Sequence, residues 1–269
     1  MRDYRIENNG PLLDFRLAYL RAIARSWHDT AYREELLMQR DIQPMLNRDF
    51  GLKSVWPLLD VAIHRIDDPG QRTVWKSHLT GGWTGLNDAF GIVMPQRPAA
   101  NASEALAAYY QFFPDFMGPV GVFAEQQAHS PVPSSAVTGL SALDEVGSLG
   151  GGPESMLAFG GVVLRAIAMA WESEEFLREL TRPDQSDATP VLSQWLGYNN
   201  PYNFFVRFAV NPDFVWDVER GAWNLKNADG STIKNSVVLN YPVAPAAEAS
   251  WPIALTSYNH TGSAYPFTC

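Results

Sequence analysis

The side chains best suited to chemistry in this sequence are five histidines and a single cysteine, Cys269. The histidines are His28, His64, His78, His129 and His260. None belongs to a His-Glu-x-x-His pair or to another recognised ligand pattern, and the sequence has no Gly-x-Ser-x-Gly elbow and no P-loop. One cysteine excludes an internal disulfide and any zinc or iron–sulfur site that needs several thiolates from one chain. The sequence therefore predicts no catalytic centre, metal or cofactor.

The composition is that of an acidic globular chain. The 269 residues are 46% hydrophobic and 18% charged, with a formal net charge of -9. The hydrophobic and charged fractions are typical of folded domains. The negative net charge argues against binding to nucleic acid or to an anionic membrane. No apolar run is long enough to cross a bilayer, and the N-terminal residues do not form a secretory segment. We expect a protein that is cytoplasmic at synthesis, with no membrane insertion.

An internal duplication in the sequence indicates where two pairs of helices lie. Residues 20–27 read Leu-Arg-Ala-Ile-Ala-Arg-Ser-Trp, and residues 164–171 read Leu-Arg-Ala-Ile-Ala-Met-Ala-Trp. Each copy carries an apolar residue at every fourth position, which predicts a helix with one buried face. These positions are Phe15, Tyr19, Ile23 and Trp27 in the first copy and Phe159, Val163, Ile167 and Trp171 in the second. Asp29 and Ser173 follow as N-caps of a second helix in each copy.

A second match lies further along both copies. Residues 95–100 and 242–247 share the pattern Pro-x-x-Pro-Ala-Ala, and each follows a β-like apolar run. In the second copy, Asp229-Gly230 marks a turn after two short strand-like segments. The prolines at 242 and 245 should end the last strand or place it at a sheet edge. We expect α+β units in which helices precede a small β-sheet.

These matches divide the chain into four segments. The first repeat covers residues 1–125, a linker rich in Pro, Ser and Gly covers 126–154, the second repeat covers 155–255, and a tail covers 256–269. A short helix near residues 142–146 could interrupt the linker. The tail shows neither a helical nor an alternating period, and its plainest interpretation is a frayed C-terminus.

The duplicated helix motif resembles the N-terminal helical part of nitrile hydratase alpha subunits. The resemblance rests on residues 21–32 and 165–176, where an Ala-rich helix leads to a tryptophan, a short acidic or polar N-cap and an aromatic residue. The apolar strands before Pro95 and Pro242 are similar to the sheet of that family. Nitrile hydratases bind iron or cobalt through a claw of three clustered cysteines, which this chain lacks. We therefore expect no nitrile hydratase activity and no enzyme.

A duplicated scaffold without the claw, followed by a short tail, resembles precursors of thiazole/oxazole-modified microcins that have nitrile-hydratase-like leaders. The resemblance implies a bacteriocin-type precursor of a ribosomally synthesised, post-translationally modified peptide from a bacterium. The folded repeats would be the leader, and the tail would be the substrate. The implied partners are a cyclodehydratase and a flavin dehydrogenase, together with a leader protease or an exporter, and the mature product would be exported.

The residues open to heterocyclisation under this resemblance are the hydroxyl and thiol residues of the tail. They are Thr256, Ser257, Thr261, Ser263, Thr268 and Cys269. Cys269 is the first candidate, because a thiol ionises most readily and could attack the carbonyl carbon of Thr268. An unmodified terminal thiol is the alternative for this residue.

Two other functions stay open. A non-catalytic nitrile-hydratase-like scaffold or binding protein would bind a partner through exposed apolar surface. An enzyme with an unrecognised site would bind its substrate in a cleft between the two repeats and would use histidines or carboxylate pairs.

Overall fold

The computed structural model describes residues 11–53, 56–77, 82–85, 88–117, 154–200 and 204–260. Most of the predicted linker, with its expected helix near 142–146, lies outside the described residues. The same is true of residues 261–269 of the predicted tail.

Within the described ranges, both repeats have the same order of elements, with three helices, then strands, then one further helix. The first repeat contains α1 (Pro11–His28), α2 (Thr30–Met38), α3 (Gln43–Phe50), β1 (Leu59–His64), β2 (Val74–Trp75), β3 (Trp83–Thr84), β4 (Asp88–Met94) and α4 (Ala102–Met117). The second contains α7 (Glu154–Glu172), α8 (Glu174–Leu180), α9 (Thr189–Leu196), β5 (Phe204–Val210), β6 (Trp216–Asp217), β7 (Ala222–Trp223), β8 (Asn235–Asn240), a 3-10 turn η3 (Glu248–Ser250) and α10 (Trp251–His260). The predicted α+β class and the duplication are confirmed.

The predicted helix starts follow the expected local chemistry. The Asp29 carboxylate accepts a hydrogen bond from the Tyr32 N–H at 2.9 Å, and the Ser173 hydroxyl accepts one from the Phe176 N–H at 3.2 Å. Each cap turns the chain sharply between the first two helices of its repeat. The predicted apolar face of α1 is also buried, since Tyr19 and Ile23 are fully enclosed.

The central β-sheet is built from both repeats. Its four strands lie in the order β1-β8-β4-β5, with β1 parallel to β8, β4 parallel to β5 and the two inner strands antiparallel. Each outer strand therefore pairs with an inner strand of the other repeat. The expectation that each repeat builds its small sheet alone applies only to the hairpins β2–β3 and β6–β7. Strand β8 ends just before Pro242 and lies inside the sheet, not at its edge.

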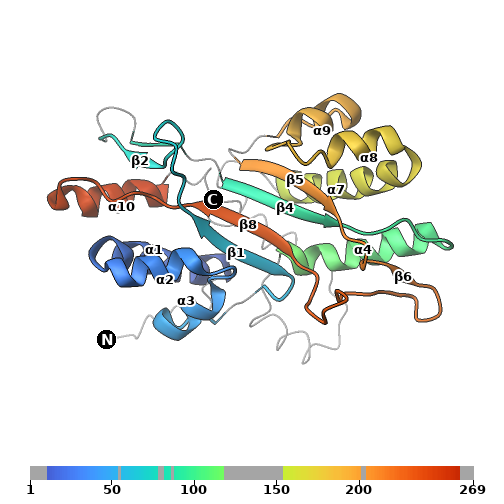
Figure 1. Cartoon of the computed structure of the whole chain (residues 1–269), viewed down its shortest axis with the longest axis horizontal. Coiled ribbons are helices and arrows are strands. Elements are labelled where there is room, and N and C mark those ends of the chain that lie inside the picture. The colour runs from blue at the N-terminus through green and yellow to red at the C-terminus, as the bar shows by residue number, and fades with distance from the viewer. Residues whose placement is uncertain are drawn as a thin grey trace.

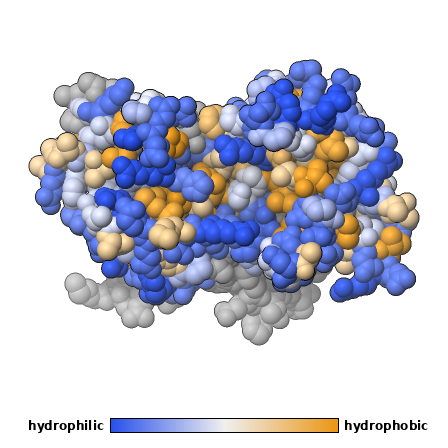
Figure 2. All heavy atoms as spheres, in the orientation of Figure 1, coloured by the Kyte–Doolittle hydropathy of each residue, from blue (hydrophilic) through white to orange (hydrophobic). Residues whose placement is uncertain are grey.

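The last helix of each repeat also crosses to the other repeat. Figure 1 shows α10 beside α1 at one end of the molecule and α4 near α7 at the other, and both pairs are in contact. The molecule thus has two lobes related by a pseudo-twofold axis, and each lobe contains elements of both repeats. Hydrophobic residues lie on both halves of the visible face among hydrophilic ones (Figure 2).

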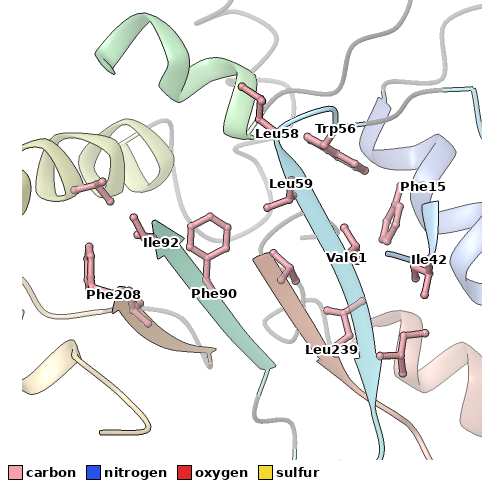
Figure 3. Packing of buried hydrophobic residues seen from close by; sticks show 14 of the residues in the cluster. Phe15, Ile42, Trp56, Leu58, Leu59, Val61, Phe90, Ile92, Phe208 and Leu239 are labelled. Carbon is pink, nitrogen blue, oxygen red and sulfur yellow. The ribbon is translucent and has the colours of Figure 1, made fainter. Parts of the chain in front are cut away.

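One hydrophobic core runs through both lobes along one face of the sheet. In Figure 3, Phe15 and Val61 of the first repeat lie near Leu239 of the second, and Phe90 lies on the side of Phe208. All five side chains are buried. No helix in the described part of the chain is long and apolar enough to cross a membrane.

Candidate functional site

Helix α10 crosses the predicted boundary between the second repeat and the tail. It runs from Trp251 to His260, so the prediction of a tail without helical period is wrong for residues 256–260. Apolar residues at positions 251, 254, 255 and 258 follow the i, i+3, i+4, i+7 pattern of a helix with one buried face. Pro252 fits within the first turn, where its missing N–H removes no helical hydrogen bond. This pattern is the sequence signal that would have extended the second repeat to residue 260.

Tyr258 anchors α10 to the first repeat. Its side chain is 1% exposed, and its hydroxyl lies 3.1 Å from the hydroxyl of Tyr19 on α1. The Tyr258 ring also packs edge-on against Trp83 at 5.2 Å, and the Trp83 indole donates to the Ala254 carbonyl at 2.7 Å. The helix that leads into the C-terminal segment is therefore held by residues of the first repeat.

Two of the six predicted modification residues lie within α10. The Thr256 hydroxyl is exposed and donates to the Pro252 carbonyl at 2.9 Å. Ser257 is half-buried and faces Gly82, where an added Cβ would lie 3.3 Å from the serine hydroxyl. In an α-helix the carbonyl before each residue accepts a backbone hydrogen bond. Heterocyclisation at Thr256 or Ser257 would consume that carbonyl and the residue's own amide, and would therefore break the anchoring helix.

The other four predicted modification residues lie outside the described residues. These are Thr261, Ser263, Thr268 and Cys269.

A cavity of about 490 Å³ lies on the side of the sheet that faces away from the core, next to β1, β8 and the end of α2. Its charged residues are paired with one another: Asp60 contacts Lys234 Nζ at 2.8 Å and Arg40 Nε at 3.0 Å. His64 is exposed at its rim. The cavity lies where strands of both repeats meet, which is the place expected for a substrate cleft in the enzyme hypothesis. Its paired charges show no arrangement of nucleophile and base.

Of the remaining histidines, the structure describes the side-chain surroundings of His28 alone. His28 ends α1 and packs against the Trp251 ring at 4.5 Å, whereas His78 and His129 lie outside the described residues. The side-chain environment of His260 is likewise not described. Within the described ranges, no three or more His, Cys, Asp or Glu side chains are grouped to hold a metal ion.

Asp88 has a strongly perturbed pKa but a structural environment. Desolvation in the core raises its pKa to about 8, although a hydrogen bond from the Asn240 N–H at 2.7 Å lowers it in part. The side chain lies at the start of β4, away from the cavity residues, and joins two inner strands of the sheet. We assign it a role in the fold and none in catalysis.

The fold and this segment define a class of protein: a duplicated α+β scaffold whose final helix leads into a short segment containing Ser, Thr and Cys. The chain matches the family model of the ribosomal natural product, two-chain TOMM family twice, over residues 10–116 and 154–266. It therefore belongs to that family and is a ribosomal natural product precursor. No curated protein and no solved structure matches it.

The two family matches end at corresponding places. The first ends shortly after Tyr109 in α4, and the second ends shortly after Tyr258 in α10. The second match includes Thr261 and Ser263 but leaves out Thr268 and Cys269. The last two candidate residues are thus additional to the duplicated unit.

Proposed function

We propose that this chain is the precursor of a thiazole/oxazole-modified peptide and is the substrate, not the catalyst, of the modifying reactions. The two repeats form the folded leader, with the nitrile-hydratase-like scaffold suggested by the helix motif. The observation that carries the proposal is membership of the TOMM precursor family over both repeats. The precursor is made in the cytoplasm, where a cyclodehydratase and a flavin dehydrogenase recognise the leader.

The chemistry takes place in the C-terminal segment. A side-chain thiol or hydroxyl adds to the preceding carbonyl carbon, and the carbonyl oxygen leaves as water in a step that the cyclodehydratase drives with ATP. The flavin dehydrogenase then removes two hydrogens to give an aromatic azole. Cys269 is the best nucleophile of the set, because a thiol ionises more readily than a hydroxyl.

The modifiable segment begins after α10. We assign Thr256 and Ser257 to the leader, and the burial of Tyr258 and the helical backbone around these two residues support this assignment. The residues that we propose for modification are Thr261, Ser263, Thr268 and Cys269. This set is narrower than the six residues that the sequence suggested, and its upstream boundary rests on the contacts of α10.

The test is co-expression of the full chain with its modifying enzymes, followed by intact mass and fragmentation. We expect the mass to fall by one water per ring, or by one water and two hydrogens per azole, with every loss within residues 261–269. An unchanged mass beside enzymes that are active on another precursor would refute the proposal. Removing residues 261–269 separates the scaffold alternative, because a scaffold would keep its partner, whereas a precursor would lose its product.

A further inference from the structure

The central sheet leaves neither repeat complete by itself. In the first repeat β1 and β4 are not neighbours, since β8 of the second repeat lies between them. In the second repeat β5 and β8 are separated by β4 in the same way. Each repeat therefore contributes two strands whose hydrogen-bonding partners all come from the other repeat.

Equivalent tryptophans join the repeats on both sides of the axis. The Trp27 indole donates to the Pro242 carbonyl at 2.9 Å, and the Trp171 indole donates to the Pro95 carbonyl at 3.2 Å. Trp27 and Trp171 are the tryptophans of the duplicated helix motif, and the two prolines open the duplicated Pro-x-x-Pro pattern. The tryptophan of each repeat thus donates a hydrogen bond to the equivalent proline of the other repeat.

A second pair of indoles repeats this arrangement at the last helices. Trp83 of the first repeat donates to Ala254 of α10 at 2.7 Å, and Trp223 of the second repeat donates to Ala105 of α4 at 2.9 Å. All four residues are buried. Such reciprocal contacts, in which one patch meets its own equivalent, are the mark of a twofold interface.

The pseudo-twofold axis passes through the middle of the sheet. Phe90 of β4 lies directly opposite Val237 of β8, and these residues occupy equivalent positions in the two repeats. Both are buried in the common core. The two inner strands therefore form a self-complementary contact.

The outer strands are closed against further pairing. On β1, the N–H of Val61 donates to the Asp41 carboxylate at 3.3 Å. On β5, the N–H of Val206 donates to the Asp187 carboxylate at 3.0 Å. An aspartate thus occupies the position of the next strand at both edges, which blocks further strand addition. The assembly is closed at two units.

We propose that this chain is a covalently joined, strand-exchanged dimer, in which the partner that completes each repeat is a second copy of the same unit. The contacts between the copies hold the assembly together without the connection through residues 118–153. The second repeat carries the C-terminal segment, and the first repeat supplies the contacts that hold the helix before it.

The test is to cut the folded full-length chain between the repeats. A recognition site for a specific protease is inserted between Pro133 and Ser134, and the native protein is cleaved. We expect the two fragments to elute together at the size of the uncut chain and to separate only in denaturant. The midpoint of urea unfolding should rise with protein concentration in the cut protein but not in the uncut protein, because only the former unfolds into two molecules.

The uncut insertion variant is the control for any effect of the inserted site itself. Separation of the fragments in native buffer would overturn the proposal, as would an unfolding midpoint of the cut protein that is independent of concentration. Neither measurement uses peptide modification, so the result is independent of the proposed precursor function.

Discussion

Asp88 and Asn235 occupy equivalent positions at the starts of the inner strands β4 and β8. The first residue carries a carboxyl group, and the second carries the corresponding amide. The Asp88 carboxylate accepts from the Asn240 N–H at 2.7 Å, and the Asn235 side-chain amide oxygen Oδ1 accepts from the Val93 N–H at 2.8 Å. Both side chains are 2% exposed. The two positions thus make the same hydrogen bond in the same burial, but only Asp88 can carry a charge.

Replacing this acid by its amide should make the protein more stable at neutral pH. Burial raises the Asp88 pKa to about 8 from 3.8. As the pH rises between these values, the unfolded state releases a proton that the folded state keeps, so stability falls by up to about 1.4 kcal/mol per pH unit. Asp88→Asn should remove this fall. Urea unfolding of both proteins at pH 5, 6, 7 and 8 measures it, and equal slopes would contradict the prediction.

The equivalent position provides the matched control for Asp88. Asn235→Asp should introduce a similar loss of stability with rising pH, because the new acid would be buried to the same extent. The double variant Asp88→Asn with Asn235→Asp should behave like the natural chain, since it moves the acid across the pseudo-twofold axis. A double variant that fails to fold would show that the two positions are not equivalent.

The hydroxyl pair of Tyr19 and Tyr258 should contribute measurably to holding α10. Tyr258→Phe should cost about 1 kcal/mol, because it removes one hydrogen bond, whereas Tyr258→Ala should cost about 3–5 kcal/mol, because it also leaves a cavity. Denaturant unfolding gives both values. Ile253→Ala, at an exposed position of the same helix, is the control and should change stability little. Equal losses for Ile253→Ala and Tyr258→Ala would argue against the anchor.

The two edge aspartates should matter for both stability and association. Asp41→Ala and Asp187→Ala each remove a carboxylate that accepts from an outer strand and from the first turn of the following helix. We expect a loss of about 1–2 kcal/mol for each and a tendency to self-associate through the opened edge. Unfolding and light scattering measure these effects. Asp213→Ala, which removes a surface loop contact, should not promote association.

Modification should distinguish the hydroxyl residues of α10 from the thiol at the end of the chain. Thr256→Ala and Ser257→Ala should leave the number of waters lost unchanged, because both residues lie within α10, which we propose is part of the leader. Cys269→Ala should reduce it by one. Mass spectrometry after co-expression measures both, and a reduced loss in Thr256→Ala would move the start of the modifiable segment into α10.

Sequence periodicity predicted the first two helices of each repeat, α1, α2, α7 and α8, because their signals are local. The four-residue spacing that ends at Trp27 and Trp171 and the caps at Asp29 and Ser173 depend only on nearby residues. The two inner strands β4 and β8 were also found, and the turn at Asp229-Gly230 precedes β8 as predicted, but the outer strands β1 and β5 were not predicted. In contrast, α3, α4, α9 and α10 were not predicted. In α10, Pro252 and several polar residues mask the short apolar face.

The pairing of strands could not be predicted from the same signals. Val61 of β1 pairs with Val237 of β8, although the two residues lie far apart in the sequence. A local sequence pattern does not indicate which distant strand will be its neighbour. The duplication suggested two separate small sheets, because a repeat usually builds its own core. Exchange between repeats depends on the contacts of both copies at once, which no single segment reveals. The anchoring of α10 could not be predicted for the same reason, since Tyr258 is held by Tyr19 of the first repeat.

The alternation of repeats in the sheet determines when the protein can fold during synthesis. Strand β1 is among the first strands to leave the ribosome, but its partner β8 lies near the end of the chain. The first repeat therefore waits for its partner through most of translation, with apolar residues and a strand edge unpaired. The scaffold is complete only when α10 has emerged, so a truncated product that lacks the C-terminal segment and α10 would also lack the finished fold. A modifying enzyme that recognises the closed fold would therefore bind only chains whose synthesis is nearly finished.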